Sequence, residues 1–317
     1  MNKYIYILSS ILFLFTSASA QKQNVYYIKN NGQYVHQRDS ADYIRIVLEK
    51  AKDSKLFTVK EFYTNGKRKS IGMSGTIDPP KYDGTYLSFY PNGNKKQVAT
   101  YSKGHLVDSL YDYYPNGRLY TFFFFIEQPD HHLVRSLKST NDSTGKAMVI
   151  DGNGPCILYS DDFKEIAEKG IVKNGWQDGI WTGKDKDAGV IYTQTYEIGK
   201  LISGESTDEK GKVVHYTREF IHPQFKGGMK ELYKYLALHI IYPKNCKDNG
   251  IQGKAIMRFA VNEDGSLSDI RVVNDVHPDL AAEAIRVLKT APSWTSGIKR
   301  GRKVRVYYSI PISFSLT

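Results

Sequence analysis

The sequence has 317 residues and a formal net charge of +11, from 44 lysines and arginines against 33 aspartates and glutamates. This length predicts two domains, because a single hydrophobic core stops growing near ~250–300 residues. The basic residues are scattered through predicted turns, which argues against nucleic acid as a partner. Two cysteines, Cys156 and Cys246, exclude a disulfide framework, and we expect two buried free thiols.

The first 20 residues have the three parts of a secretory signal peptide. A basic tip ending at Lys3 precedes an apolar run over residues 4–15, and Ala18-Ser19-Ala20 forms a cleavage site. The apolar run is shorter than the ~20 residues that a membrane-spanning helix needs. We therefore expect cleavage before Gln21 and export to the periplasm or cell envelope. The alternative is an uncleaved N-terminal anchor.

The middle of the chain repeats an aromatic pair followed by an Asn-Gly turn. The clearest copies are Phe62-Tyr63-Thr64-Asn65-Gly66, Phe89-Tyr90-Pro91-Asn92-Gly93 and Tyr113-Tyr114-Pro115-Asn116-Gly117. Asn-Gly predicts type I′ hairpin turns, in which both central residues have positive φ. The aromatic and β-branched residues between the turns predict strands. We expect an antiparallel meander of hairpin repeats over residues 56–216, with residues 21–55 as its opening strands or cap.

These repeats resemble MORN-type repeats in the bacterial form with a YPNG core. We expect their aromatic side chains to pack across strands; the alternative is a flat surface for glycan or lipid headgroups. Residues 130–146 break the rhythm and predict an insertion or a long loop. His131-His132 lies in it, and we expect no metal there, because only Asp130 stands at ligand spacing.

The last hundred residues have a different pattern, which begins at a boundary within residues 217–223. Apolar spacing predicts helices over residues 229–239 and from Pro278 to just before Pro292. Alternation predicts strands over residues 253–261, 267–274 and 303–314. This order predicts an α+β domain over residues 221–317, with two helices on one face of a three-stranded antiparallel sheet. Trp294 is expected in its core, the alternative being an aromatic that contacts a peptide.

Short motifs in this region follow the order and spacing of the TonB C-terminal domain. They are Phe225-Lys226-Gly227-Gly228, Tyr242-Pro243, Gly250-Ile251-Gln252-Gly253, Val261-Asn262-Glu263-Asp264-Gly265, Ala284-Ile285-Arg286-Val287-Leu288, Trp294 and Arg300-Gly301-Arg302-Lys303-Val304. About 95 residues therefore resemble this domain of the energy transducer TonB family. Lys226 and Ser296 stand where the family usually has proline.

The resemblance implies recognition by β-strand addition. In TonB transducers, a short peptide of an outer-membrane receptor, the TonB box, adds to the sheet beside the last strand. On this chain, the implied pairing residues are Val304, Arg305, Val306, Tyr307, Tyr308, Ser309 and Ile310. The segment that also touches the receptor in transducers corresponds to His239, Ile240, Ile241 and Tyr242. Pro311 removes one donor near the strand end, which is typical of an edge strand.

The resemblance thus implies a non-enzymatic, TonB-like periplasmic protein that binds a TonB-dependent outer-membrane receptor, or a similar envelope protein, in support of transmembrane transport. Inner-membrane motor proteins would be partners only if the N-terminus is an uncleaved anchor. The alternative is a structural envelope protein whose repeats bind peptidoglycan or another protein. No catalytic motif, cofactor site or metal site is predicted. His277-Pro278-Asp279 is expected to begin a helix, rather than to act in acid–base chemistry.

Overall fold

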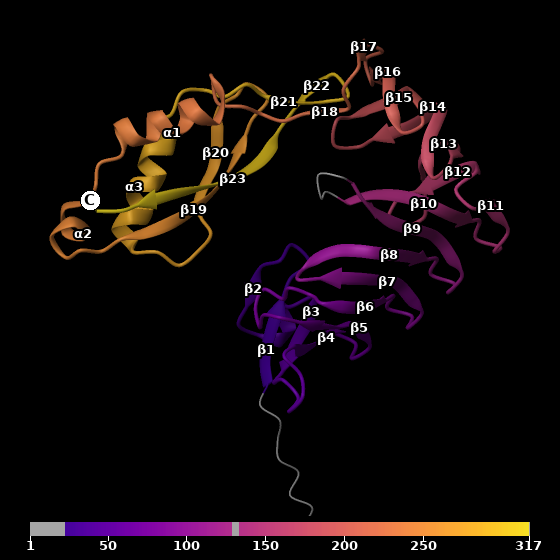
Figure 1. Ribbon diagram of the computed structural model, residues 1–317, viewed down its shortest axis with the longest axis horizontal. Helices are drawn as coiled ribbons and strands as arrows, with labels where there is room; N and C mark the ends of the chain where they lie inside the picture. The colour runs from indigo at the N-terminus through magenta and orange to yellow at the C-terminus, as the bar shows by residue number, and fades with distance from the viewer. Residues whose placement is uncertain (1–22, 129–132, 317) are drawn as a thin grey trace, which may run out of the picture. The chain divides into compact units, whose positions relative to one another are not determined.

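The computed structural model describes residues 23–128 and 133–316 (Figure 1). The expected signal peptide and the pair His131-His132 lie outside the described residues. The chain divides into two compact units. One extends to Arg135 and includes Asn141–Lys146; the other holds Ser136–Thr140 and Ala147–Thr317.

The first unit is an antiparallel meander, as the repeats predict. Its strands are β1 (Gln23–Ile28), β2 (Tyr34–Val35), β3 (Tyr43–Leu48), β4 (Phe57–Tyr63), β5 (Arg68–Ser74), β6 (Gly84–Phe89), β7 (Lys95–Ser102), β8 (His105–Tyr113) and β9 (Leu119–Glu127), with a 3-10 turn η1 at Arg38–Ser40. Their order in the sheet is β2-β1-β3-β4-β5-β6-β7-β8-β9. Almost every strand therefore pairs with its neighbours in the sequence, which is the simplest solution for a chain of hairpins.

The interruption expected at residues 130–146 is wrong for most of its length. Residues Leu133–Asn141 form a further strand, β10, which contributes to both units. Its side chains at Leu137 and Thr140 are buried. The strand was missed because its sequence has no aromatic pair, and its second half, after Leu137, is polar.

The Asn-Gly turns do not have the predicted type I′ geometry. In the second copy, the Tyr90 amide donates to the Asn94 carbonyl (2.8 Å), and the Gly93 amide donates to the Tyr90 carbonyl (2.8 Å). Gly93 has a φ of 99°, whereas Asn92 has no positive φ. The Asn92 side chain instead accepts a hydrogen bond from the Asn94 amide (3.0 Å). A three-residue loop, with glycine alone in the left-handed region and a bulge in the strand, replaces the two-residue turn.

The tyrosine before each turn binds one repeat to the next. Each hydroxyl donates to a backbone carbonyl at the end of the following hairpin's strand. The three bonds run from Tyr63 to Phe89 (2.7 Å), from Tyr90 to Tyr113 (2.7 Å) and from Tyr114 to Asn141 (2.9 Å). The recurrent spacing of these tyrosines is therefore a structural requirement of the stacked hairpins.

We expect Tyr90→Phe to destabilise the first unit by about 1 kcal/mol, because it removes one hydrogen bond and leaves a carbonyl without its partner. Urea unfolding followed by far-ultraviolet circular dichroism would measure this. Tyr27→Phe is the control, since the Tyr27 hydroxyl makes no hydrogen bond within the described part of the chain. Equal stability losses in the two variants would contradict a role for the hydroxyl ladder.

The second unit begins with another antiparallel sheet. After β11 (Ala147–Val149), its strands are β12 (Gly154–Tyr159), β13 (Ile166–Lys173), β14 (Trp176–Asp185), β15 (Val190–Glu197), β16 (Lys200–Asp208) and β17 (Val213–Tyr216), paired in that order. On β15, the side chains of Val190, Tyr192, Gln194 and Tyr196 are buried and those between them are exposed. This strict alternation is typical of a sheet with one solvated face. Cys156 on β12 is buried and free.

The C-terminal region of this unit confirms the predicted α+β architecture. Its elements are β18 (Phe220–Ile221), α1 (Gly228–His239), α2 (Lys244–Asp248), β19 (Gly253–Val261), β20 (Leu267–Val272), α3 (Pro278–Lys289), β21 (Gly297–Lys299), β22 (Arg302–Val304) and β23 (Val306–Phe314). The main sheet has the order β20-β19-β23, and α1 and α3 cover one of its faces (Figure 1). A second small sheet, β18-β21-β22, and the short helix α2 were not predicted.

The core of this domain lies between the two long helices and the main sheet. It gathers Leu232 and Leu236 of α1, Val287 and Leu288 of α3, and inward side chains of β19 and β23. Trp294 is 4% exposed, and its ring lies 5.4 Å from that of Phe259 and 5.3 Å from that of Tyr308. The expectation of a core tryptophan is thus confirmed.

Arg300 attaches the β21–β22 hairpin to the second repeat sheet. Its guanidinium donates to the carboxylates of Asp185 and Glu219, and it lies 3.9 Å from the centre of the Tyr192 ring. Lys299 adds a second cation 3.0 Å from Asp185, whose side chain is 3% exposed. The hydroxyl of Ser206 donates to the Arg300 carbonyl (2.8 Å). A buried carboxylate with two cationic partners is costly to disturb, because removing its charge takes one anionic partner from both Arg300 and Lys299.

We expect Asp185→Asn to destabilise the second unit by about 3 kcal/mol near neutral pH. Burial raises the pKa of the Asp185 carboxyl, but Lys299, the Ala188 amide and Arg300 outweigh it and hold the pKa below its usual range. The stabilisation is therefore present above the unfolded pKa of about 3.9 and is lost as the pH falls through the lower folded value.

The measurement is thermal unfolding as a function of pH, in which Asp185→Asn should flatten the acid limb. Asp187→Asn is the matched control, because its side chain is 88% exposed and only touches Lys299 at 3.4 Å. An unchanged acid limb in Asp185→Asn would contradict the assignment of this pair as an anchor.

A candidate partner-binding edge

The last strand, β23, lies at the edge of the main sheet. It pairs with β19 along its whole length, in antiparallel register from Val261 opposite Val306 to Gly253 opposite Phe314. Within residues 23–128 and 133–316, no strand pairs with the other side of β23. Nine residues of backbone thus have one hydrogen-bonded side and one open side.

The backbone groups at the open side follow from the pairing of β19. The Ile256 amide donates to the Asn274 side chain (2.6 Å), and the Ile256 carbonyl accepts from the Val273 amide (2.9 Å). The amide and carbonyl of Ile256 therefore point toward β20. Pro311 stands directly opposite Ile256 on β23, so its backbone nitrogen and carbonyl point away from β19, to the open side. By alternation, the outward backbone groups belong to Tyr307, Ser309, Pro311 and Ser313. Of these, only Pro311 lacks an N–H group.

The side chains of β23 separate into a buried and an exposed set. Ile310 and Ile312 are 2% exposed and face the helices, whereas Tyr307 and Ser309 are exposed on the opposite face. There the Tyr307 hydroxyl donates to Asp269 (3.0 Å), and Arg305 contacts both residues. The Arg305 and Tyr307 hydrogen bonds hold the pKa of Asp269 below its usual range. These contacts hold the N-terminal end of β23 against Asp269 of β20.

The predicted single strand over residues 303–314 is wrong at its start. The chain breaks at Arg305, and Val304 belongs to β22, where it is buried and pairs with Gly297. The break has a physical cause: Val304 faces the small sheet that Arg300 anchors, while Val306 begins the pairing with β19. Val306, Tyr307, Tyr308, Ser309 and Ile310 lie on β23 as expected.

The second predicted segment, His239 to Tyr242, leaves the end of α1. His239 stacks on Tyr235 with ring centres 4.1 Å apart, and Ile241 is 66% exposed. Ile240 packs against the core. Of these four residues, Tyr242 makes a ring contact with β23, with its ring centre 5.9 Å from that of Phe314. The structure therefore brings one of these four residues to the C-terminal end of the strand.

Two residues of α3 that the sequence did not indicate position this segment. Glu283 accepts a hydrogen bond from the Ile241 amide (2.6 Å), and Arg286 donates to the His239 carbonyl (2.7 Å). The two side chains also pair with each other at 2.7 Å. Burial raises the pKa of the Glu283 carboxyl, but Arg286 and the Ile241 amide outweigh it and lower the pKa below its usual range. In the sequence, the one feature that could have indicated this role is the i,i+3 spacing of Glu283 and Arg286 beside apolar residues of α3.

We expect Glu283→Gln to loosen the segment without unfolding the domain. Glutamine still offers an oxygen to Ile241 but loses the charge that Arg286 holds in place, and such bonds contribute about 1.5–3 kcal/mol. Amide exchange at Ile241 should accelerate by about tenfold. Glu231→Gln is the control, because that carboxylate only approaches Lys234 at 3.8 Å on an exposed surface. Unchanged exchange at Ile241 would show that the pair does not restrain the segment.

The residues His277 and Asp279 begin helix α3, as predicted. The His277 side chain caps the helix by accepting from the Asp279 amide (3.3 Å), Pro278 occupies the first turn, and Asp279 adds a negative charge there. Both features are favourable at a helix N-terminus. The helix-start interpretation is confirmed.

Part of this region is similar to known proteins. Residues 239–316 match the model of the Gram-negative bacterial TonB protein C-terminal family. A TonB C-terminal domain therefore spans these residues. Two NMR solution structures of the Helicobacter pylori TonB C-terminal domain, of different lengths, are also similar. They are 28% and 27% identical, cover 28% and 27% of this chain and 80% and 91% of their own, and have TM-scores of 0.23. No curated protein matches the chain.

The TonB C-terminal family consists of non-enzymatic energy transducers that are associated with the cell envelope and interact with outer-membrane receptors. The family match begins at His239, at the end of α1, and includes the whole of the main sheet. None of the helices in the described residues has the length and apolar composition to span a bilayer.

Proposed function

We propose that this protein binds an extended segment of an outer-membrane receptor, or of a similar envelope protein, by adding it as a fourth strand beside β23. The observation that carries the proposal is the open side of β23 in the sheet order β20-β19-β23. Through this contact the protein would support transmembrane transport as a TonB-like component of the periplasm, after export by its N-terminal signal.

The open edge has the chemistry that strand addition requires. Amides of Tyr307, Ser309 and Ser313 alternate with carbonyls along it, so an incoming strand would find donors and acceptors at regular spacing. Long open edges are normally blocked by charge, bulges or proline, because they recruit other chains. On β23, the single outward-facing proline, Pro311, blocks only one donor, close to the strand end.

The edge is also held in place by contacts with the rest of the domain, which would reduce the entropy lost on binding. Its inward side chains Ile310, Ile312 and Phe314 are buried in the domain core. The cluster of Arg305, Tyr307 and Asp269 restrains the N-terminal end, and Tyr242 lies against Phe314 at the other end. A preformed strand binds more tightly than one that must be ordered first. The repeats would act as a MORN-like structural platform for this domain.

The test uses a synthetic peptide with the sequence of a receptor's TonB box. Its binding should shift the amide NMR signals of Tyr307–Ser313 more than those of the repeat strands. Ser309→Pro removes one outward N–H group, and we expect about tenfold weaker binding, since a hydrogen bond contributes about 0.5–1.5 kcal/mol. Ser309→Ala is the matched control, because it changes the same side chain but keeps the amide.

Equal affinity of the Ser309→Pro and Ser309→Ala variants would exclude pairing at this edge.

One observation supports a second candidate function, the binding of cell-wall glycan by the strands of the second unit. The exposed face of β13–β16 has a hollow of about 460 Å³, lined by Ile166, Lys169, Thr182, Ile191, Thr193 and Glu205, among others. Sedimentation of the chain with purified peptidoglycan, unaffected by Ser309→Pro, would favour a structural envelope protein that binds cell-wall glycan there.

A further inference from the structure

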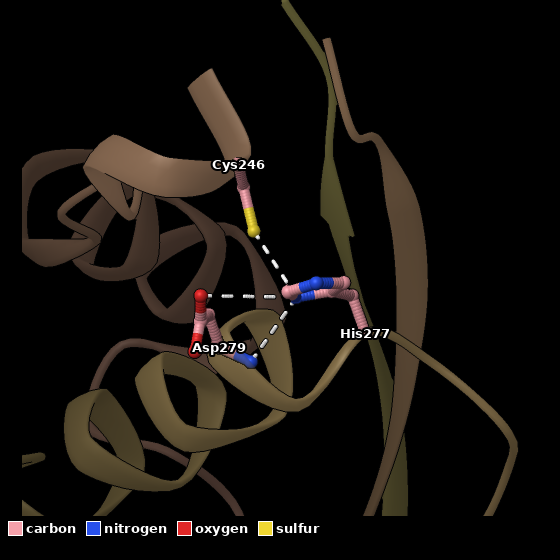
Figure 2. A group of neighbouring side chains, drawn as sticks. All are labelled: Cys246, His277 and Asp279. Atoms are coloured by element: carbon pink, nitrogen blue, oxygen red, sulfur yellow. Dashed lines mark hydrogen bonds and ion pairs between the residues drawn. The ribbon is translucent and has the colours of Figure 1, made fainter. Parts of the chain in front are cut away.

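Three side chains with metal-binding atoms meet where α2 approaches the start of α3. Figure 2 shows Cys246 of α2 facing His277 and Asp279 at the N-terminus of α3. The Cys246 sulfur lies 3.3 Å from His277 Nδ1, and His277 Nδ1 lies 3.9 Å from an Asp279 carboxylate oxygen. All three ligand atoms lie within 4.8 Å of one another, and they form the one such group among the described residues.

These separations match those around a small tetrahedral ion. Zn²⁺ binds sulfur at about 2.3 Å, and nitrogen and oxygen at about 2.0–2.2 Å, so tetrahedral ligands stand roughly 3.3–3.7 Å apart. The Cys246–His277 separation already fits. The Asp279 oxygen lies 3.9 Å from His277 Nδ1 and within 4.8 Å of the sulfur, so it would have to approach them by about 1 Å. Cys246 is fully buried, whereas the side chains of His277 and Asp279 are 30% and 46% exposed, which leaves access for a water as fourth ligand.

The surroundings of the group favour ligation as well. Asn245 donates to the Asp279 carboxylate (3.0 Å) and so orients it from outside the group. Such outer contacts are typical of metal ligands. The thiolate and the carboxylate would carry two negative charges at the positive end of the α3 dipole and would neutralise a divalent cation.

An ordinary helix cap leaves one feature of this group unexplained. His277 Nδ1 has a single in-plane lone pair, yet it faces both the Cys246 thiol at 3.3 Å and the Asp279 amide at 3.3 Å. The two donors cannot both be satisfied well by one acceptor. One metal ion in contact with Nδ1, sulfur and carboxylate would use these three groups at once, and the Nδ1 lone pair would then bind the metal in place of the Asp279 amide.

We infer that Cys246, His277 and Asp279 form a binding site for a divalent transition metal of the Zn²⁺ class, with one position open to water. Nitrogen, sulfur and oxygen ligands together select Zn²⁺ over Mg²⁺ or Ca²⁺. The sequence predicted no metal site, because the cysteine lies 31 residues before the histidine, and the two do not form one of the short ligand spacings by which metal sites are recognised.

The metal would link α2 to α3 and so restrict the motion of residues 240–243, which connect α1 to α2. Cys246 also accepts from the Ile251 amide (2.8 Å) through its carbonyl, and Tyr242 donates to the Ile251 carbonyl (2.7 Å). The site is therefore connected to Tyr242, which lies against the end of β23. The inference does not depend on the proposed function, since metal binding is measured without any partner.

The experiment titrates the full chain, first freed of metal with a chelator, with Co²⁺. We expect one equivalent to bind, with a thiolate-to-cobalt charge-transfer band in the near ultraviolet and the intense visible bands of a tetrahedral ion. Zn²⁺ should abolish both sets of bands. Cys246→Ser should lose the charge-transfer band, while Cys156→Ser, which removes the other buried thiol, should keep it.

A second variant guards against misfolding of Cys246→Ser. His277→Asn keeps a good N-cap acceptor for α3 but removes the imidazole ligand. We expect it to weaken Co²⁺ binding by more than about tenfold, the loss that even outer contacts of a metal site can cause. Weak octahedral Co²⁺ spectra without the thiolate band, or unchanged affinity in His277→Asn, would overturn the inference.

Discussion

One constraint underlies the C-terminal domain: the main sheet has three strands, and its last strand is bonded on one side only. The inward side chains of this strand form the core, so the strand cannot rotate to bury its unpaired backbone groups. Ile310 and Ile312 hold β23 against the helices, so the outward backbone groups stay presented to solvent. The rigidity of the core and the openness of the edge are thus two results of the same packing.

In the repeat region, by contrast, most strands are hydrogen-bonded on both sides. Each hairpin pairs with the next along the chain, and the tyrosine hydroxyls close the contacts between successive turns. In the second unit, the β21–β22 hairpin is attached to the repeat sheet through Arg300, Lys299 and Asp185. The hairpin and β23 are separated only by Arg305, so the open strand begins next to the hairpin that these charged residues attach.

The sequence was sufficient where local patterns carry the information. Alternation and turn signals predicted the meander, and helical spacing predicted α1 and α3. The ordered motifs from Phe225 to Val304 pointed to the domain that the family match identifies over residues 239–316. The boundary within residues 217–223 and the strand-addition residues remain predictions. The errors were local as well: Asn-Gly allows more than one turn, and β10 lacks the aromatic pair that marks the other repeats.

What the sequence determined by itself was the set of elements and their order, because periodicity and turn chemistry act over a few residues. Which groups meet across the fold was decided only by tertiary structure. Glu283 reaches Ile241 over 42 positions, Arg300 reaches Asp185 over 115, and Cys246 meets His277 over 31. These contacts depend on how helices and sheets pack on one another, and no local pattern encodes the distance between two side chains that approach from separate elements.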